Sequence, residues 1–309
     1  MKTEGFDLKR RRKFFQNVLA LPAIASIGIL GNIGDTYAKP PLANGEKKPM
    51  LKLSLNAYSF NKQLLNGSMS LDDLLEFAAD VGLMAVDITA YYFKGYPAIP
   101  SDEVMYNVKR KAFSLGLEIC GTGVRNDFTH ADTAKRRESV QLVKNWIDVA
   151  QKLGGQTVRI FSGTQKPQGF KRAEILEWMV KDIRECVAYG ESRGIVVALQ
   201  NHDDFIKTAA DTVEIMEAIK SPWFGLMLDI GSFRTTDPYD EIAQTIRYAV
   251  TWQIKEKVFI RGKETDVNAV KLMNLIKASG FRGYLPLEAL GEGDPKLKVK
   301  ALARKFAGL

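Results

Sequence analysis

Segments of strand length and segments with a helical period alternate eight times between residues 51 and 309, and this alternation constrains the fold more than any other feature. The helical period is clearest in 131–153, where Val140, Val143 and Ile147 fall on one face. Eight strand–helix units in about 260 residues are the number and length of a (β/α)8 barrel. We therefore predict an α/β protein with a single-domain (β/α)8 TIM barrel over 51–309. The predicted strands are 51–58, 85–92, 117–124, 157–163, 195–201, 224–230, 251–259 and 283–290, and the predicted helices are 70–82, 102–115, 131–153, 171–193, 208–219, 239–249, 266–279 and 294–307.

A doubly wound open sheet is the alternative fold for the same alternation. Its dinucleotide-binding forms carry a glycine fingerprint that follows a strand and opens a helix. Here Gly121-Thr122-Gly123 follows a predicted strand, but the third glycine is missing and no helix begins at once. The barrel is therefore the favoured architecture.

The first 38 residues resemble an export signal rather than a part of the domain. A basic block containing Arg11 and Arg12 leads into an apolar run, Val18–Leu30, and then to small residues around Ala38 that suit a cleavage site. The apolar run is 13 residues long, whereas a membrane-spanning helix needs about 20. We predict a cleaved twin-arginine-type signal peptide at 1–38, export to the periplasm and no stable membrane anchor.

The remaining chain begins with a linker, 39–50, that contains three prolines and a glycine. Removal of the signal takes away six Lys or Arg and three Asp or Glu, so the formal net charge falls from +8 to +5. The mature sequence has no basic run interleaved with aromatic residues, so we expect no nucleic-acid partner. Cys120 lies in a predicted strand and Cys186 in the middle of a predicted helix. We expect two buried free thiols in preference to a disulfide.

Polar side chains collect where the last four predicted strands end. Functional residues of a (β/α)8 barrel lie at the carboxyl ends of its strands, and the strand period of two sets which side chains face the axis. This alternation directs Gln200, Asp229, Gln253, Lys255 and Glu288 toward one axial region. Two carboxylates inside a barrel are costly unless they are paired or bind a metal. The sequence therefore predicts an active site at this mouth.

The segments ALQNHDDF, FGLMLDIGSF, WQIKEK and YLPLEAL resemble four motifs of the xylose isomerase-like superfamily of sugar isomerases and epimerases, in order and spacing over 51–309. The resemblance implies a divalent-metal site with ligands at Gln200, Asp229, Gln253 and Glu288, where the family has Glu, Asp, His and Glu. Two glutamines in this set leave an all-oxygen cage, which suits Mn²⁺, Mg²⁺ or Ca²⁺ better than Zn²⁺. The resemblance also implies a substrate contact at Ser232, where the family commonly has a histidine.

Isomerases and epimerases of this superfamily move a proton on a carbon next to a carbonyl, which requires a base and stabilisation of the enediolate. Glu288 is the candidate base, whereas Gln200 cannot titrate. His202 and Lys255 are the two candidates for the second acid or base. His202 is equally interpreted as a loop histidine that caps nearby backbone, and Lys255 also suits substrate contact.

Further residues are candidates for substrate binding. Arg159 either binds a substrate hydroxyl or pairs with an acid, and both interpretations stay open. Tyr91 and Tyr92 follow the second predicted strand and either form a flat wall for a sugar ring or pack against a neighbouring loop. Asp203 and Asp204 are expected to be solvated loop acids.

The acidic loop 291–294 would repel a phosphate, which favours a neutral sugar. The DNA-repair branch of the superfamily is excluded because its multi-zinc site needs many histidines and this chain has two. We predict a metal-dependent isomerase or epimerase of a neutral carbohydrate, with enediolate chemistry. The alternatives are a lyase or hydrolase that acts on an oxidised (keto) glycoside, and a non-catalytic sugar-binding barrel. Whether the chain forms a homo-oligomer stays open.

Overall fold

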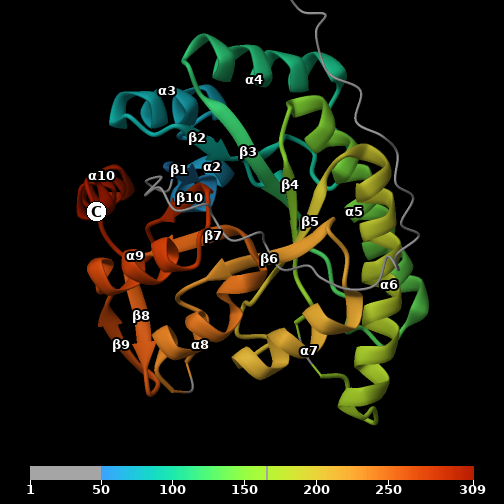
Figure 1. Cartoon of the computed structure of the whole chain (residues 1–309). Helices are drawn as coiled ribbons and strands as arrows, with labels where there is room; N and C mark the ends of the chain where they lie inside the picture. Colours follow the sequence, from blue (N-terminus) through green and yellow to red (C-terminus); the bar gives the residue numbers. More distant parts are fainter. Residues whose placement is uncertain (1–49, 165, 235) are drawn as a thin grey trace, which may run out of the picture. The chain divides into compact units, whose positions relative to one another are not determined.

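The computed structural model of the protein describes residues 50–164, 166–234 and 236–309, in which eight parallel strands close into a barrel. The strands follow one another round the barrel in chain order, and the last, β10, pairs with both β7 and β1. Figure 1 shows the ring of strands with helices round it. The barrel strands are β1 (Leu51–Asn56), β2 (Ala85–Asp87), β3 (Glu118–Gly123), β4 (Thr157–Ile160), β5 (Val196–Gln200), β6 (Phe224–Asp229), β7 (Ala249–Lys255) and β10 (Gly283–Glu288).

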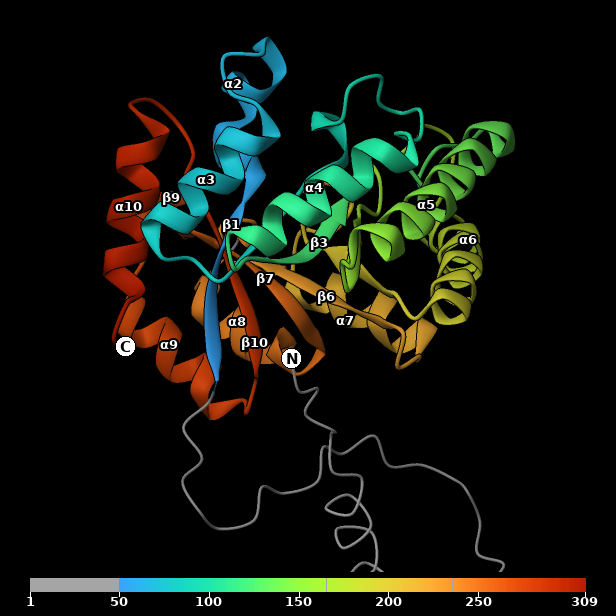
Figure 2. The ribbon, with the colours of Figure 1, turned by 90° about the horizontal axis from the view of Figure 1, so that it is seen from above.

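Helices connect the strands on the outside of the barrel, as the view in Figure 2 also shows. The predicted (β/α)8 barrel is confirmed, and the open doubly wound sheet is wrong because the sheet is closed. The helices are α2 (Asn61–Asn66), α3 (Leu71–Val81), α4 (Asp102–Ser114), α5 (Thr133–Leu153), α6 (Arg172–Arg193), α7 (Ala209–Ile219), α8 (Pro238–Thr245), α9 (Ala269–Ala278) and α10 (Pro295–Phe306), with single 3₁₀ turns at η1 (Ala57–Phe60), η2 (Ala90–Tyr92) and η3 (Ile246–Tyr248).

Several helices begin where a capping side chain satisfies the free amides of the first turn. Ser70 and Thr208 each form a reciprocal capping box, with Asp73 before α3 and Asp211 before α7 respectively. Asp294 accepts a hydrogen bond from the Lys296 amide at 2.8 Å, and a proline follows it at the first helical position. The local sequence therefore fixes these helix starts.

The predicted strand 251–259 is wrong in its second half. Strand β7 ends at Lys255, and 257–260 forms an antiparallel hairpin with 263–266 (β8, Lys257–Ile260, and β9, Lys263–Asp266). Arg261 and Gly262 make the turn, both with positive φ (51° and 75°), as a tight two-residue hairpin turn requires. The hairpin occupies the start of the predicted helix 266–279, so α9 begins three residues late.

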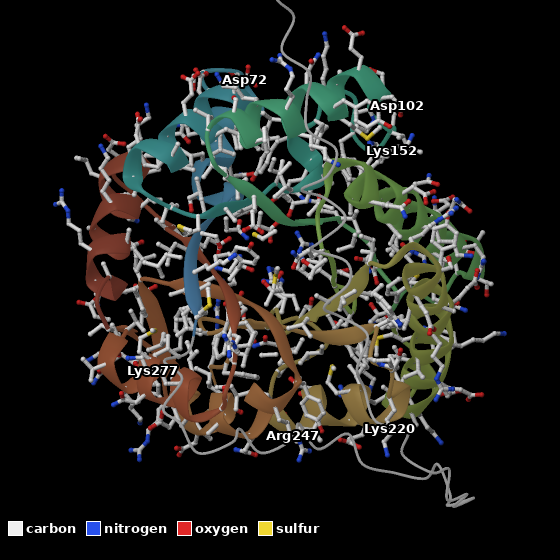
Figure 3. The ribbon with its side chains drawn as sticks, turned by 45° about the horizontal axis from the view of Figure 1, so that its top comes forward. Asp72, Asp102, Lys152, Lys220, Arg247 and Lys277 are labelled. Atoms are coloured by element: carbon white, nitrogen blue, oxygen red, sulfur yellow. The ribbon has the colours of Figure 1, made fainter. Side chains whose placement is uncertain are left out.

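The core lies between the barrel and its helices. Val140, Val143 and Ile147 of α5 are fully buried, as their spacing predicts. Cys120 and Cys186 are both buried and free, as expected. Charged residues lie on the outer side of the helices. Asp102 and Lys152 lie next to each other there in Figure 3 and form an ion pair of 2.5 Å.

The predicted signal peptide, 1–38, lies outside the described residues, and so does the predicted linker apart from Met50. Within the described residues, none of the helices is both long and apolar enough to cross a lipid bilayer.

Candidate functional site

A cavity of about 1240 Å³ opens at the carboxyl ends of the barrel strands. Strand alternation directs five side chains to the barrel axis, and four of them line this cavity. The fifth, Asp229, is fully buried and lies outside the lining. Only one carboxylate of the predicted set, that of Glu288, is therefore open to a substrate. The polar and charged lining residues include Asn56, Asp87, Arg125, Asn126, Arg159, Gln200, His202, Ser232, Gln253, Lys255 and Glu288.

The ammonium group of Lys255 lies between the two buried carboxylates. Its Nζ is 2.7 Å from Oδ2 of Asp229 and 3.3 Å from Oε2 of Glu288. The strand register produces this arrangement, because Glu288 pairs with Lys255 across β10 and β7, and Asp229 pairs with Gln253 across β6 and β7. The two carboxylates thus meet round a cation that belongs to the chain itself.

The two glutamines extend this network across the axis. Nε2 of Gln200 donates to Oδ2 of Asp229 at 2.8 Å and to Oε1 of Gln253 at 2.7 Å. The Gln200 amide therefore presents its nitrogen to the carboxylate, and the carbonyl oxygen of Gln253 is already an acceptor. Both side chains are almost fully buried.

Asn201 holds the end of β6 in place, and the sequence reasoning missed it. Its side chain accepts a hydrogen bond from the backbone amide of Asp229 and donates one to the Asp229 carbonyl, both at 2.9 Å. Asn201 lies next to Gln200, and strand alternation directs it away from the axis. Its complete burial is the property that marks it as structural.

Gly231 makes room for the lysine and was also missed. A Cβ atom at this position would lie 2.7 Å from Cδ of Lys255. The Gly231 amide donates to Oδ1 of Asp229 at 2.9 Å. The sequence signal was present in the motif LDIGSF, but only the structure shows which side chain the glycine admits.

The ionisation of the three charged groups is set by burial and by their mutual contacts. Burial raises the pKa of the Glu288 carboxyl, and Lys255 opposes this only in part. Burial acts in the same direction on Asp229, but the charge and hydrogen bond of Lys255 outweigh it and lower the pKa of that carboxyl. Burial lowers the pKa of Lys255, but the two carboxylates outweigh it and raise the pKa. The lysine therefore stays charged, and Glu288 is the carboxyl that takes up a proton more readily.

As arranged, Gln200, Asp229, Gln253 and Glu288 do not fit the divalent cation that the resemblance implies. The Lys255 ammonium lies between the two carboxylates, and Oδ2 of Asp229 accepts from both Lys255 and Gln200. Among the described residues no group of three or more His, Cys, Asp or Glu could hold a metal ion. The residues present thus form an ion-paired network instead of a cage of free acceptors.

His202 lies in the cavity lining and packs against Phe161, with the two rings tilted and their centres 4.5 Å apart. Burial against the wall lowers its pKa to about 4, although half of the side chain remains exposed. The imidazole is therefore neutral near pH 7. Asp204 corrects the expectation of a solvated loop acid, because its side chain is 11% exposed and accepts from the Ser162 hydroxyl at 2.9 Å. Asp203 pairs with Arg234 at 3.1 Å at the rim.

Arg159 projects its guanidinium into the cavity from β4. Nη2 donates to the Tyr91 hydroxyl at 2.7 Å, Nη1 donates to the Val124 carbonyl, and the group lies 3.9 Å from the centre of the Phe161 ring. Arg159 forms no ion pair with the described residues. Pairing with an acid, one of its two predicted roles, is therefore not observed. A rigidly held donor remains available to a ligand.

The aromatic residues after β2 divide into two groups. Tyr91 lines the cavity and contacts Tyr58 and Tyr96 edge to face. Tyr92 is not part of the lining, and its hydroxyl donates to Asn61 at 3.0 Å. Of the two tyrosines expected to bind substrate, only Tyr91 is thus placed to do so, and Tyr92 packs against the neighbouring segment. Ser232 lies in the lining.

Asp87 is a further carboxyl of the cavity. It is 3% exposed at the end of β2, and burial raises its pKa to about 6, with Arg159 acting in the opposite direction.

Comparisons with known proteins place this geometry in a family. A family model described as xylose isomerase-like TIM barrel matches residues 75–307. D-psicose 3-epimerase from Clostridium cellulolyticum H10, solved with D-tagatose, is 16% identical over 82% of this chain and 95% of that chain, with a TM-score of 0.66. The structure of 3-keto-D-glucoside 4-epimerase from E. coli is 12% identical over 83% of this chain and 98% of that chain, with a TM-score of 0.66.

A third solved structure, the IOLI protein with a zinc atom, is 17% identical over 82% of this chain and 95% of that chain, with a TM-score of 0.68. Identities this low show a shared fold. No curated protein matches the chain significantly. Because the family model spans most of the sequence, this chain belongs to the xylose isomerase-like TIM barrel family.

Proposed function

We propose that this protein is an isomerase or epimerase of a neutral sugar or sugar derivative, with Glu288 as the base that removes a proton next to a carbonyl. The proposal rests on the burial and the contacts of Oε2 of Glu288. This oxygen is buried beside the cavity, and its ion-pair partner is the Lys255 ammonium, 3.3 Å away. A carboxylate held in this way, with a raised pKa, has the properties of a general base.

The proposed reaction balances without a further reactant. The Glu288 carboxylate takes the proton from the carbon next to the carbonyl, and the released electron pair forms the carbon–carbon double bond of an enediolate. The carbonyl oxygen becomes the oxyanion, near the charge of Lys255. Return of the proton to the former carbonyl carbon, while the proton of the adjacent hydroxyl passes to the oxyanion, gives the isomer. Protonation of the original carbon on its opposite face by water, with release of the Glu288 proton to solvent and re-formation of the carbonyl, gives the epimer.

The neighbouring groups suit a neutral, hydroxyl-rich ligand. Arg159 offers donors to hydroxyl oxygens, and Tyr91 offers an aromatic face. Sugar epimerases are among the solved structures of this fold. No metal ion is part of the proposed chemistry, because the donor set described above does not fit one.

The test is solvent deuterium exchange. Neutral ketoses and aldoses are incubated with the protein in D₂O, and incorporation at carbon is read by NMR. We expect Glu288→Gln to slow the exchange by about 10²–10⁴-fold, the usual contribution of a general base. Glu292→Gln, the same substitution in the loop after β10 and outside the cavity lining, is the matched control. Full turnover by the Glu288 variant would refute the proposal.

Elimination from a keto-glycoside is the second candidate, because of the two predicted carboxylates, Asp229 and Glu288, only Glu288 lines the cavity. Asp229 is buried behind Lys255 and cannot reach a substrate in the cavity. Glu288 is therefore the one carboxylate of the predicted set that can act on the substrate. Removal of the proton next to the ketone with loss of the aglycone, which leaves with a proton, needs one base only. Release of the aglycone from a 3-keto-glucoside distinguishes this reaction from isomerisation. Ligand binding without any turnover would identify a sugar-binding barrel.

A further inference from the structure

Lys255 lies between the carboxylates of Asp229 and Glu288, where the resemblance to the family implies a metal ion. We infer that the Lys255 ammonium is the permanent cation of this site and that the barrel takes no divalent metal between Asp229 and Glu288. The occupant of this position does not depend on which sugar the protein binds.

The charge of Lys255 opposes a divalent ion at this position. The ammonium already lies 2.7 Å and 3.3 Å from the two carboxylates, so a divalent ion bound to the same oxygens would come within about 4 Å of a positive charge. At this separation in a protein interior, the repulsion outweighs most of what a weak oxygen site gains. The lysine is also held in its charged form by the same carboxylates.

Few oxygen acceptors at this position are free to bind a metal ion. A carboxylate oxygen accepts about two hydrogen bonds. Oδ2 of Asp229 accepts from Lys255 and Gln200, and Oδ1 accepts from the Gly231 amide. Oε1 of Gln253 accepts from Gln200. A metal would have to displace several of these bonds and turn the Gln200 amide round.

The packing round the Lys255 side chain also favours the lysine, independently of the hydrogen bonds. The stem of Lys255 passes so close to Gly231 that a Cβ atom there would approach Cδ to 2.7 Å. Only 16% of the lysine side chain is exposed. The glycine at position 231 thus leaves the space that the Lys255 side chain fills. A chance contact between Lys255 and the carboxylates would not require such a space.

The arrangement also leaves one donor free, and this part of the inference rests on the proposed function. An ammonium group has three N–H donors. One is directed to Asp229 and one faces Glu288, and the described residues offer no third acceptor. Because Lys255 lines the cavity, the third N–H is available to the carbonyl oxygen of a substrate.

The test measures metal binding and needs no substrate. Purified protein is analysed for bound metals and titrated with Mn²⁺, followed by electron paramagnetic resonance. We expect no stoichiometric metal in the unmodified protein. We expect Lys255→Met to bind Mn²⁺ at least about tenfold more tightly, because the repelling charge is gone. Melting temperature gives a second reading, since Mn²⁺ should stabilise the Lys255 variant and leave the unmodified protein unchanged.

Lys257→Met is the matched control, because Lys257 pairs with Asp266 on the exposed hairpin, outside the cavity lining. It should leave Mn²⁺ affinity unchanged. One tightly bound divalent ion per unmodified chain, lost in Asp229→Asn, would overturn the inference, even if Lys255→Met did not fold. Failure of the sugar exchange assay would overturn the proposed function and leave this result standing.

Discussion

Glu288 and His202 ionise at different pH, which separates their roles at the scale of single residues. Burial raises the pKa of Glu288 above the ordinary 4.5, and burial lowers that of His202 to about 4. A base works only when deprotonated, so activity should fall as pH drops through its pKa. We expect the acidic limb of kcat/KM to have its midpoint above 4.5. A midpoint at or below 4.5 would contradict the assignment of Glu288 as the base.

Gly231 offers a second prediction about a single residue. Gly231→Ala places a methyl group against the stem of Lys255, so the ammonium must shift. We expect a loss of stability of about 1–3 kcal/mol and a fall in kcat of roughly tenfold to a hundredfold from misplacement of the charge. Urea unfolding and steady-state rates measure the two effects.

Gly155→Ala serves as its control, since a Cβ there meets nothing closer than 3.4 Å. Unchanged rates in Gly231→Ala would show that the position of the ammonium does not matter for turnover.

Individual site residues were predictable to different degrees. Strand alternation was enough to bring Gln200, Asp229 and Glu288 to one region, because parity and strand order determine the side of the strand. It could not show that Lys255 lies between the carboxylates, since that depends on the rotamer of a long side chain. Asn201 was missed because its partners are backbone groups of a neighbouring strand.

At the scale of elements, helix caps give the most direct prediction. Asp294 caps α10 through the Lys296 amide, so Asp294→Ala should cost about 0.5–2 kcal/mol of unfolding free energy. Asp294→Asn, which keeps an acceptor, should lose much less. Equal losses in both variants, measured by denaturant unfolding, would show that the cap contributes little.

The helices were predictable because their caps and periodicity are local. The predicted helix 102–115 and α4 (Asp102–Ser114) differ by one residue. The hairpin of β8 and β9 was not found, because its short strands have no apolar alternation and its turn, Arg261-Gly262, is a weak signal without asparagine or aspartate. Its formation depends on the main chain leaving the barrel after Lys255.

At the scale of the whole molecule, eight repeats of one pattern specified the closed barrel, since few other folds accommodate that number and length. The shape of the cavity could not be predicted, because its outer wall includes side chains from the first half of α5 as well as the strand ends. Loops and helices that surround the mouth are placed by tertiary packing alone.

Export to the periplasm is a proposal that rests on residues 1–38. If the twin-arginine pair is the signal, Arg11→Lys with Arg12→Lys should retain the unprocessed chain in the cytoplasm. Cell fractionation and mass spectrometry of the N-terminus check this, with the unaltered chain expected to begin close to residue 39. Substitution of Lys2 and Lys9 by Arg is the control and should permit export.

The lysine between the carboxylates has a consequence for where such an enzyme can work. Its positive charge is encoded in the gene and is in place as soon as the chain folds, so assembly requires no metallochaperone. With Lys255 as the inferred permanent cation, mismetallation, which is the exchange of one ion for a more competitive one, would not arise. The barrel therefore suits surroundings where trace elements are scarce or chelators are abundant.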